Sequence, residues 1–248
     1  MSKIISIHSF RGGTGKSNTT ANLAVSLAQM GLRVCVVDTD IQSPGIHVMF
    51  QLNPKDIKFS LNDFLWGKCE IEQTAHEMST EDSKGRVFLI PSSMRTGDIA
   101  RVLKFGYDIQ LLREGFMNII SKLTIDVLLI DTHPGLNEET LMSIALSDVL
   151  LIILRPDAQD YQGTAVTVEV ARQIEVPQMY LLMNKVPDLF DKTETIEKAQ
   201  EAFTCPVIAI LPHSDEMMML ASNGIFVRQY PDHPITREIG MVAQKILG

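Results

Sequence analysis

The chain has 248 residues, of which 45% are hydrophobic and 21% are charged, and its formal net charge is −8. This balance is ordinary for a folded globular protein, and the acid excess argues against a surface coated with cations for nucleic acid, although it leaves room for a local basic patch. No apolar run approaches the roughly 18 residues of a membrane span, no signal peptide is recognisable, and the cysteines are far apart, so we expect a cytoplasmic protein with free thiols.

Short apolar runs alternate with helical patterns along the chain. The runs are rich in β-branched residues and leucine without polar alternation, which is typical of strands buried on both faces of a parallel sheet. Strands are predicted at residues 4–7, 34–37, 87–90, 127–130, 149–154, 179–183 and 207–211. Helices are expected at residues 21–30, 60–66, 108–123, 158–174 and 193–203, with a last helix over 234–248 and an exposed polar loop over 79–85.

The alternation predicts a fold class. It is α/β, a doubly wound, mostly parallel sheet with helices on both faces. No shift in composition marks a second domain, so we expect residues 1–248 to form a single domain. In such a fold, ligands bind at the carboxyl ends of the strands.

The first predicted strand leads into a glycine-rich segment, Phe-Arg-Gly-Gly-Thr-Gly-Lys-Ser-Asn, at residues 10–18. Glycines let successive backbone N–H groups converge on a polyphosphate. Lys16 would place a positive charge at the β- and γ-phosphates, and Ser17 would offer a hydroxyl to Mg²⁺. The segment therefore predicts a phosphate-binding loop built on Gly12, Gly13 and Gly15.

The loop departs from the ordinary phosphate-loop pattern, G-x-x-x-x-G-K-[ST]. That pattern requires glycine where this chain has Phe10. The variant K-G-G-x-G-K-[ST] fits at every position except its first lysine, which is Arg11 here. The glycine pair thus favours the variant class, with arginine in place of the lysine.

Polar residues follow three of the predicted strands. Asp131 ends the strand at 127–130, Asp38 and Asp40 follow the strand at 34–37, and Asn184 follows the strand at 179–183. An aspartate that ends a strand beside the phosphate loop would stand near Mg²⁺, and Asp131 is the natural Walker B residue. Asp40 also fits a solvated turn, and Asp and Asn favour turns after strands in general. His133 has no Asp or Ser partner visible in the sequence, so we expect packing or hydrogen bonding there rather than general-base catalysis.

Read in order with the late Leu211-Pro212 and the segment Ala-Ser-Asn-Gly at 221–224, these motifs resemble the MinD/ParA family of deviant Walker ATPases over residues 4–246. Members of that family position division sites, plasmids, chromosomes or organelles such as the carboxysome. The resemblance implies a P-loop NTPase fold, ATP and Mg²⁺ as cofactors, slow ATP hydrolysis and an ATP-dependent homodimer. It also implies a cargo adaptor or activator protein as partner.

The resemblance further implies roles for individual residues. Asp131 would hold Mg²⁺ through water, with Ser17 and Asp38 beside the metal, and Asp40 would position the attacking water. The segments 38–45 and 132–135 would respond to the γ-phosphate. The catalytic residues implied are Lys16, Asp40, Asp38 and Arg11. The nucleotide-binding residues implied are Gly12, Gly13, Thr14, Gly15, Lys16, Ser17 and Asn18, with Asn184 and Pro212 at the adenine.

Two positions depart from the family pattern. The family's signature lysine reaches across the dimer to the partner's phosphates, and Arg11 occupies its place; we hypothesise that Arg11 acts as an arginine finger between two ATP-bound subunits. Asn18 stands where threonine is usual, although its backbone N–H could still meet the α-phosphate.

The sequence does not decide whether the dimer binds a membrane or DNA. The polar face of the last helix has only Arg237 and Lys245 as cations, and the helix carries no aromatic residue, so we expect it to pack in the core and disfavour a membrane anchor. Nonspecific DNA needs several cations on one face. Candidates are Arg228, Arg237 and Lys245, and separately Arg95, Arg101, Lys104 and Arg113.

Other functions remain as alternatives. An iron-protein-like reductase would need cysteine just after Asp131, where Thr132 and His133 stand. A phosphoryl-transfer enzyme would need a separate substrate pocket, and a MinD-like membrane regulator would need an anchor. Asp40 and Lys16 argue against a nucleotide-binding protein that no longer hydrolyses.

Overall fold

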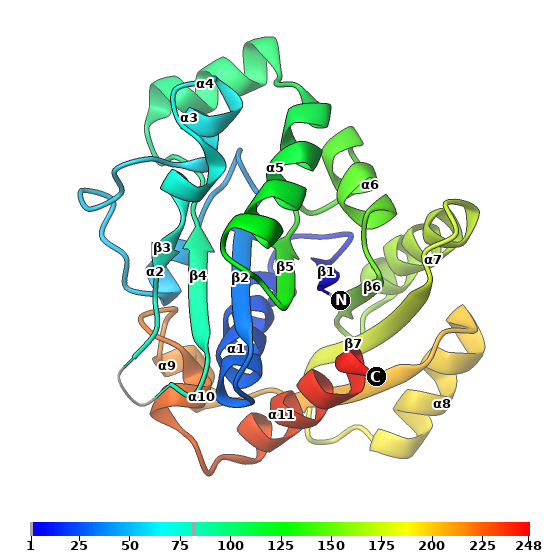
Figure 1. Ribbon diagram of the computed structural model, residues 1–248. Helices are drawn as coiled ribbons and strands as arrows, with labels where there is room; N and C mark the ends of the chain where they lie inside the picture. Colours follow the sequence, from blue (N-terminus) through cyan, green and yellow to red (C-terminus); the bar gives the residue numbers. More distant parts are fainter. Residues whose placement is uncertain (1, 81–82) are drawn as a thin grey trace.

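The computed structural model describes residues 2–80 and 83–248 (Figure 1). Within them, the strands form one eight-stranded sheet in the order β3-β4-β2-β5-β1-β6-β7-β8. Neighbouring strands pair in parallel, except that β3 is antiparallel to β4. The strands are β1 (Lys3–His8), β2 (Arg33–Asp38), β3 (His76–Glu77), β4 (Arg86–Ile90), β5 (Val127–Asp131), β6 (Val149–Leu154), β7 (Gln178–Val186) and β8 (Val207–Pro212). The predicted α/β fold class and its mostly parallel sheet are confirmed.

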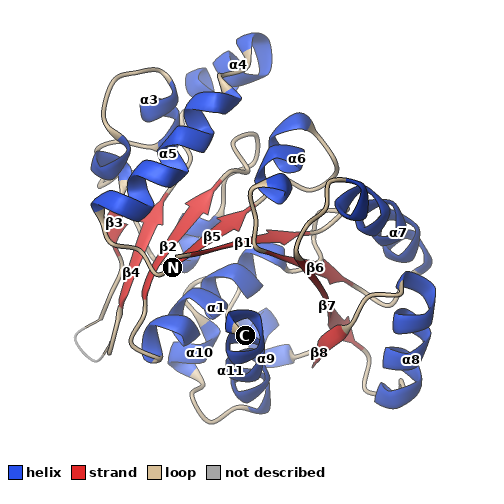
Figure 2. Cartoon of the chain, turned by 45° about the vertical axis from the view of Figure 1, so that its right-hand side comes forward, coloured by secondary structure: helices blue, strands red, loops and turns tan. Residues whose placement is uncertain are grey.

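Helices cover both faces of the sheet (Figure 2). One layer contains α1, α10 and α11, and the opposite layer contains α3, α5, α6 and α7. The helical bounds are α1 (Lys16–Gln29), α2 (Ile46–Met49), α3 (Leu61–Leu65), η1 (Ile71–Thr74), α4 (Thr96–Phe105), α5 (Ile109–Lys122), α6 (Glu138–Ala145), α7 (Ala158–Gln173), α8 (Lys192–Phe203), α9 (Asp215–Met219), α10 (Phe226–Gln229) and α11 (Pro234–Leu247).

Strand residues alternate between the two layers although both faces are buried. In β2, Val34 and Val36 pack with α1, whereas Cys35 and Val37 pack with the α5 layer. This arrangement explains why the sequence shows continuous apolar runs rather than polar alternation.

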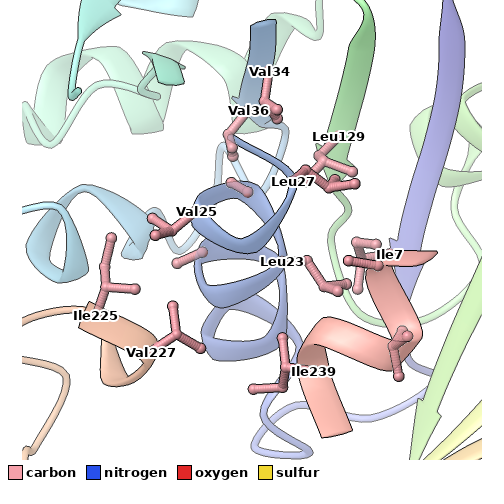
Figure 3. Packing of buried hydrophobic residues seen from close by; sticks show 14 of the residues in the cluster. Ile7, Leu23, Val25, Leu27, Val34, Val36, Leu129, Ile225, Val227 and Ile239 are labelled. Carbon is pink, nitrogen blue, oxygen red and sulfur yellow. The ribbon is translucent and has the colours of Figure 1, made fainter. Parts of the chain in front are cut away.

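Helix α1 is surrounded by the core (Figure 3). Leu23 and Leu27 are fully buried in the core, where Ile225, just before α10, and Ile239 of α11 also pack around the helix. A helix held in this way fixes the position of its first turn, which follows directly from the glycine-rich loop. The core thus positions the candidate site.

The structure extends or adds several elements. α1 begins at Lys16 rather than at residue 21, so the loop's last residues lie in its first turn. β7 continues to Val186, which places Asn184 and Lys185 inside the strand instead of after it, at a bulge against β8. The edge strand β3 and the helices α2, α4, α6, α9 and α10 were not predicted. The polar run at 79–85 has no helix or strand at its described positions, and its residues 81–82 lie outside the described part.

The last helix behaves as predicted. Pro234 stands at its start, and Nδ1 of His233 accepts a hydrogen bond from the Ile235 N–H at 3.1 Å. Its apolar face is buried against α1 and β8, so this face already has a partner. Across residues 2–80 and 83–248, no helix combines the length and apolar character needed to cross a bilayer.

Candidate functional site

The glycine-rich loop joins β1 to α1 and is braced by β7. Gly15 precedes the helix with φ 99°, and a Cβ built there would collide with the side chain of Asn184. Asn184 Nδ2 donates to the carbonyl of Thr14 at 2.8 Å, and Lys185 Nζ donates to the carbonyl of Gly13 at 2.9 Å. The backbone of the loop is therefore held from two sides, and only glycine fits at position 15.

A cavity of about 450 Å³ opens over this loop. Its wall comes from the loop and the first turn of α1, from Asp40 after β2, from the end of β7 and from the segment after β8. Among the predicted nucleotide-binding residues, those that line the cavity are Gly12, Gly13, Thr14, Gly15, Lys16, Ser17, Asn18, Asn184 and Pro212. The tertiary structure brings these three distant parts of the chain to one cavity at the carboxyl edge of the sheet.

Two buried carboxylates lie next to Lys16. Asp38 and Asp131 are register partners in adjacent strands, so their side chains point to the same face of the sheet. Lys16 Nζ lies 2.9 Å from Asp131 Oδ1, which also accepts a hydrogen bond from the Thr20 hydroxyl at 3.1 Å. Burial, followed by the nearby charge of Asp131, raises the pKa of Asp38 well above its usual range. The ionised form of Asp38 is thus disfavoured beside Asp131, and the charge of Lys16 partly offsets this effect.

These residues fit Mg²⁺. The Oδ2 atoms of Asp38 and Asp131 are both buried, and neither has a hydrogen-bond partner among the described residues. Ser17 adds a hydroxyl on the cavity wall. Oxygen donors of this kind suit magnesium, which keeps several waters and phosphate oxygens as ligands. Within residues 2–80 and 83–248, no group of three or more His, Cys, Asp or Glu side chains is placed to hold a metal ion.

Asp40 and His133 form a contact that the sequence did not predict. His133 Nδ1 lies 2.6 Å from Asp40 Oδ1, and the hydrogen bond to this carboxylate raises the pKa of His133. The pair joins the segment after β2 to the segment after β5. His133 has no partner nearby in the sequence, because Asp40 lies 93 positions away.

His8, at the end of β1, is buried beside the site. Its Nδ1 lies 2.8 Å from the hydroxyl of Thr132, which in turn donates to the carbonyl of Ile7 at 3.0 Å. Burial, followed by the charge of Lys16, lowers the pKa of His8 to about 3. His8 is therefore a neutral part of the packing at neutral pH.

Arg11 points away from the cavity, toward the start of α7. Its Nη1 lies 3.7 Å from Asp160 Oδ1 and 3.9 Å from Asp157 Oδ1, and 42% of its side chain is exposed. Arg155 makes the closer contacts with the same carboxylates, at 3.0 Å to Asp160 and 3.1 Å to Asp157. The guanidinium of Arg11 is thus loosely held and accessible from outside the subunit.

Phe10 explains the missing glycine of the ordinary pattern. Its ring packs against Gly163 of α7, where any Cβ would collide with it. The aromatic residue anchors the start of the loop to α7, and Gly163 makes room for it.

At the far end of the cavity, Pro212, Ala221 and Ser222 belong to motifs that the sequence singled out, and further residues there do not. These further residues come from the end of β8 and from α9, and they are His213, Ser214, Met217 and Met218. Their only signal in the sequence is their place after a strand whose carboxyl end faces the ligand edge.

The chain is similar to known proteins along its whole length. A family model described as an AAA domain matches residues 2–181. The chain is 29% identical over 250 residues to an uncharacterized ATP-binding protein of Methanocaldococcus jannaschii, covering 100% of this chain and 89% of that protein. It is 25% identical over 256 residues to the septum site-determining protein MinD of Bacillus subtilis, covering 100% of this chain and 90% of MinD.

Solved structures show the same fold. MinD of Pyrococcus horikoshii, complexed with Mg-ADP, superposes with a TM-score of 0.83 at 23% identity, covering 99% of this chain and 96% of that one. The family model, the full-length relatives and the shared fold lead to one identification: the chain belongs to the AAA domain family and is a MinD/ParA-family ATPase.

Proposed function

We propose that this protein binds Mg-ATP in the cavity over the loop, hydrolyses it slowly, and acts as a positioning switch for a cellular cargo. The observation that carries the proposal is the buried contact of Lys16 with Asp131 under a cavity lined by the glycine-rich loop. The solved structure of MinD from Pyrococcus horikoshii, which has the same fold, is complexed with Mg-ADP. One domain over residues 1–248 would carry the whole activity.

Different residues of the chain would have different roles in ATP binding and hydrolysis. Backbone N–H groups of the loop and the N-terminus of α1 would bind the phosphates, since both present positive potential to an anion. Lys16 would move from Asp131 toward the β- and γ-phosphates, which frees Asp131 to face the metal. Bound Mg²⁺ would neutralise phosphate charge as the γ-phosphoryl group leaves. Asp40, on the cavity wall, would position the attacking water.

We further propose a homodimer that forms with ATP bound, with Arg11 entering the partner's site. Its exposure and its loose contacts with Asp157 and Asp160 support this role, because the guanidinium can leave them at little expense. An Arg11→Ala protein is expected to dimerise or hydrolyse less well than wild type. Unchanged dimerisation together with an unchanged rate would contradict the arginine-finger hypothesis.

The surface that the dimer works on, its adaptor and its cytoplasmic location stay predictions. Several candidate DNA-binding cations are engaged within the chain: Arg228, Arg237 and Lys245 bond backbone carbonyls, and Arg95 pairs with Asp63 and Asp98. Arg101 and Lys104 on α4 are exposed. Binding of the ATP-loaded protein to duplex DNA at low salt tests this function, and no binding there rejects it.

Sedimentation tests the central proposal. Wild-type protein is expected to be monomeric without nucleotide and dimeric with Mg-ATP. Asp40→Ala should remain trapped as a dimer with ATP, because it binds ATP but does not activate water, and Lys16→Ala should stay monomeric. Identical behaviour of the three proteins would reject the switch. Repeating the series with DNA and with liposomes separates the two candidate surfaces.

A further inference from the structure

The contact between His133 and Asp40 is short and shielded. Nδ1 and Oδ1 are 2.6 Å apart, and the two side chains are only 23% and 14% exposed. Nδ1 carries a proton in one neutral tautomer as well as in the imidazolium, so the histidine can donate to the carboxylate without a change of charge. A charge-assisted hydrogen bond of this length fixes the orientation of the carboxylate.

The backbone holds both partners in place. The Asp40 N–H donates to Asp38 Oδ1 at 3.1 Å, and the Ser43 N–H donates to Asp40 Oδ1 at 3.1 Å. On the other side, the Thr140 hydroxyl donates to the carbonyl of His133 at 3.2 Å. The backbone hydrogen bonds of the two segments therefore hold the histidine and the carboxylate within contact distance of each other.

Both side-chain contacts use the same oxygen of Asp40. Ser43 and His133 bond Oδ1, while Asp40 also lines the cavity. Among the described residues, Oδ2 has no such partner, so it is free to accept a hydrogen bond from water in the cavity. One oxygen of Asp40, Oδ1, thus fixes the position of the carboxylate, and the other, Oδ2, remains for the cavity.

We propose that His133 is a positioning residue for ATP hydrolysis, which holds Asp40 Oδ1 so that Oδ2 faces the attacking water. The inference rests on the proposed function, since it takes Asp40 as the residue that orients this water. His133 acts through Asp40 and needs no contact with ATP. It also ties the segment after β2 to the segment after β5, so the two segments that face the γ-phosphate move as a unit.

Kinetics of His133 variants test the inference. His133→Ala is expected to lower kcat for ATP about 10- to 100-fold with KM changed less than about threefold, because a small displacement of a positioned group affects the chemical step most. His133→Asn, whose amide can donate from the position of Nδ1, should recover kcat to within about fivefold of wild type. His76→Ala, in the edge strand β3, is the matched control and should behave as wild type.

Two measurements separate positioning from folding. With a non-hydrolysable ATP analogue, dimerisation of His133→Ala should equal that of wild type, while amide exchange over residues 40–45 should become faster. In an Asp40→Asn background, His133→Ala should cause no further loss of kcat, because both residues act through one carboxylate.

Different failures have different meanings. If wild-type protein hydrolyses ATP and His133→Ala keeps its kcat or exceeds it, the positioning role is overturned and the proposed function stands. Equal losses in the Asn and Ala variants, or additive losses with Asp40→Asn, also overturn the role. If wild-type protein neither binds nor hydrolyses ATP, the proposed function falls and this inference falls with it.

Discussion

The two ends of the cavity are built differently. At the end beside the glycine-rich loop, where we propose that phosphates bind (the phosphate end), buried charges and backbone groups meet at hydrogen-bond distances, as between Lys16 and Asp131 at 2.9 Å. At the opposite end the wall combines Pro212 and the methionines of α9 with His213 and Ser214, and Met218 is 62% exposed. Binding at the first end depends on the positions of individual polar atoms, whereas binding at the second depends mainly on the shape of a wall that includes apolar side chains.

The difference predicts unequal sensitivity to substitution. A buried charge that loses its partner has no water to replace it, so single changes at the phosphate end should be severe. Methionines are flexible and fill irregular space, so the other end should tolerate change. Each of the following predictions can break or sharpen this contrast.

The largest effect is expected for Gly15→Val. Valine strains the backbone at φ 99° and collides with Asn184, so the loop can no longer present its N–H groups. Binding of both ATP and inorganic tripolyphosphate should weaken at least about 100-fold, close to 3 kcal/mol, by calorimetric titration. Gly97→Ala on α4, where a Cβ meets nothing within 4 Å, is the control and should bind as wild type.

Asp131→Asn should lower the free energy of unfolding by about 3 kcal/mol, because it leaves Lys16 buried without its partner. Urea unfolding without nucleotide measures the change. Thr20→Val removes the second donor to the same oxygen and should have the smaller effect. Equal stability of Asp131→Asn and wild type would show that the contact with Lys16 contributes nothing.

The buried His8 should make stability depend on pH. Its folded pKa of about 3 lies below the unfolded value of 6.5, so the unfolded chain binds the extra proton first. Neutral His8 therefore makes its full contribution to the free energy of unfolding above pH 6.5. This contribution is lost on acidification toward pH 3, at up to about 1.4 kcal/mol per pH unit. His8→Asn should flatten the dependence of urea unfolding on pH.

Asp38→Asn should have the opposite sign to Asp131→Asn. Ionised Asp38 is opposed by burial and by Asp131, so a neutral amide should stabilise the nucleotide-free protein by on the order of 1 kcal/mol. The same variant should gain less stability from Mg-ATP than wild type in thermal unfolding. A loss of stability without nucleotide would show that Asp38 is not repelled by its surroundings.

The smallest effect is expected for Met217→Ala at the far end of the cavity. Binding of ATP should weaken about threefold to tenfold, near 1 kcal/mol, and binding of tripolyphosphate should not change. Met219→Ala, which is 73% exposed and outside the cavity wall, is the control. An equal loss for both ligands would remove the distinction between the two ends.

Only one end of the cavity could be recognised in the sequence, because its residues are close together in the chain. The phosphate loop lies within residues 10–18, and its glycines and Lys16 have a recognisable spacing because a tight turn allows few residue types. The opposite wall combines a proline with methionines that carry no pattern of their own. The sequence showed no partner for His133. Its partner Asp40 follows a different strand, and the two residues meet only because β2 and β5 are neighbours in the sheet.

The sequence by itself determined the α/β alternation, the glycine-rich loop and the acidic residues at the strand ends. Each depends on residues that are neighbours in the chain or on the regular spacing of buried residues. Only the tertiary structure decided which of these residues touch. The register of β2 against β5 places Asp38 beside Asp131, the bulge in β7 aims Lys185 and Asn184 at the loop, and the packing of α7 turns Arg11 outward. Such contacts depend on strand order and side-chain packing, and those are properties of the whole fold.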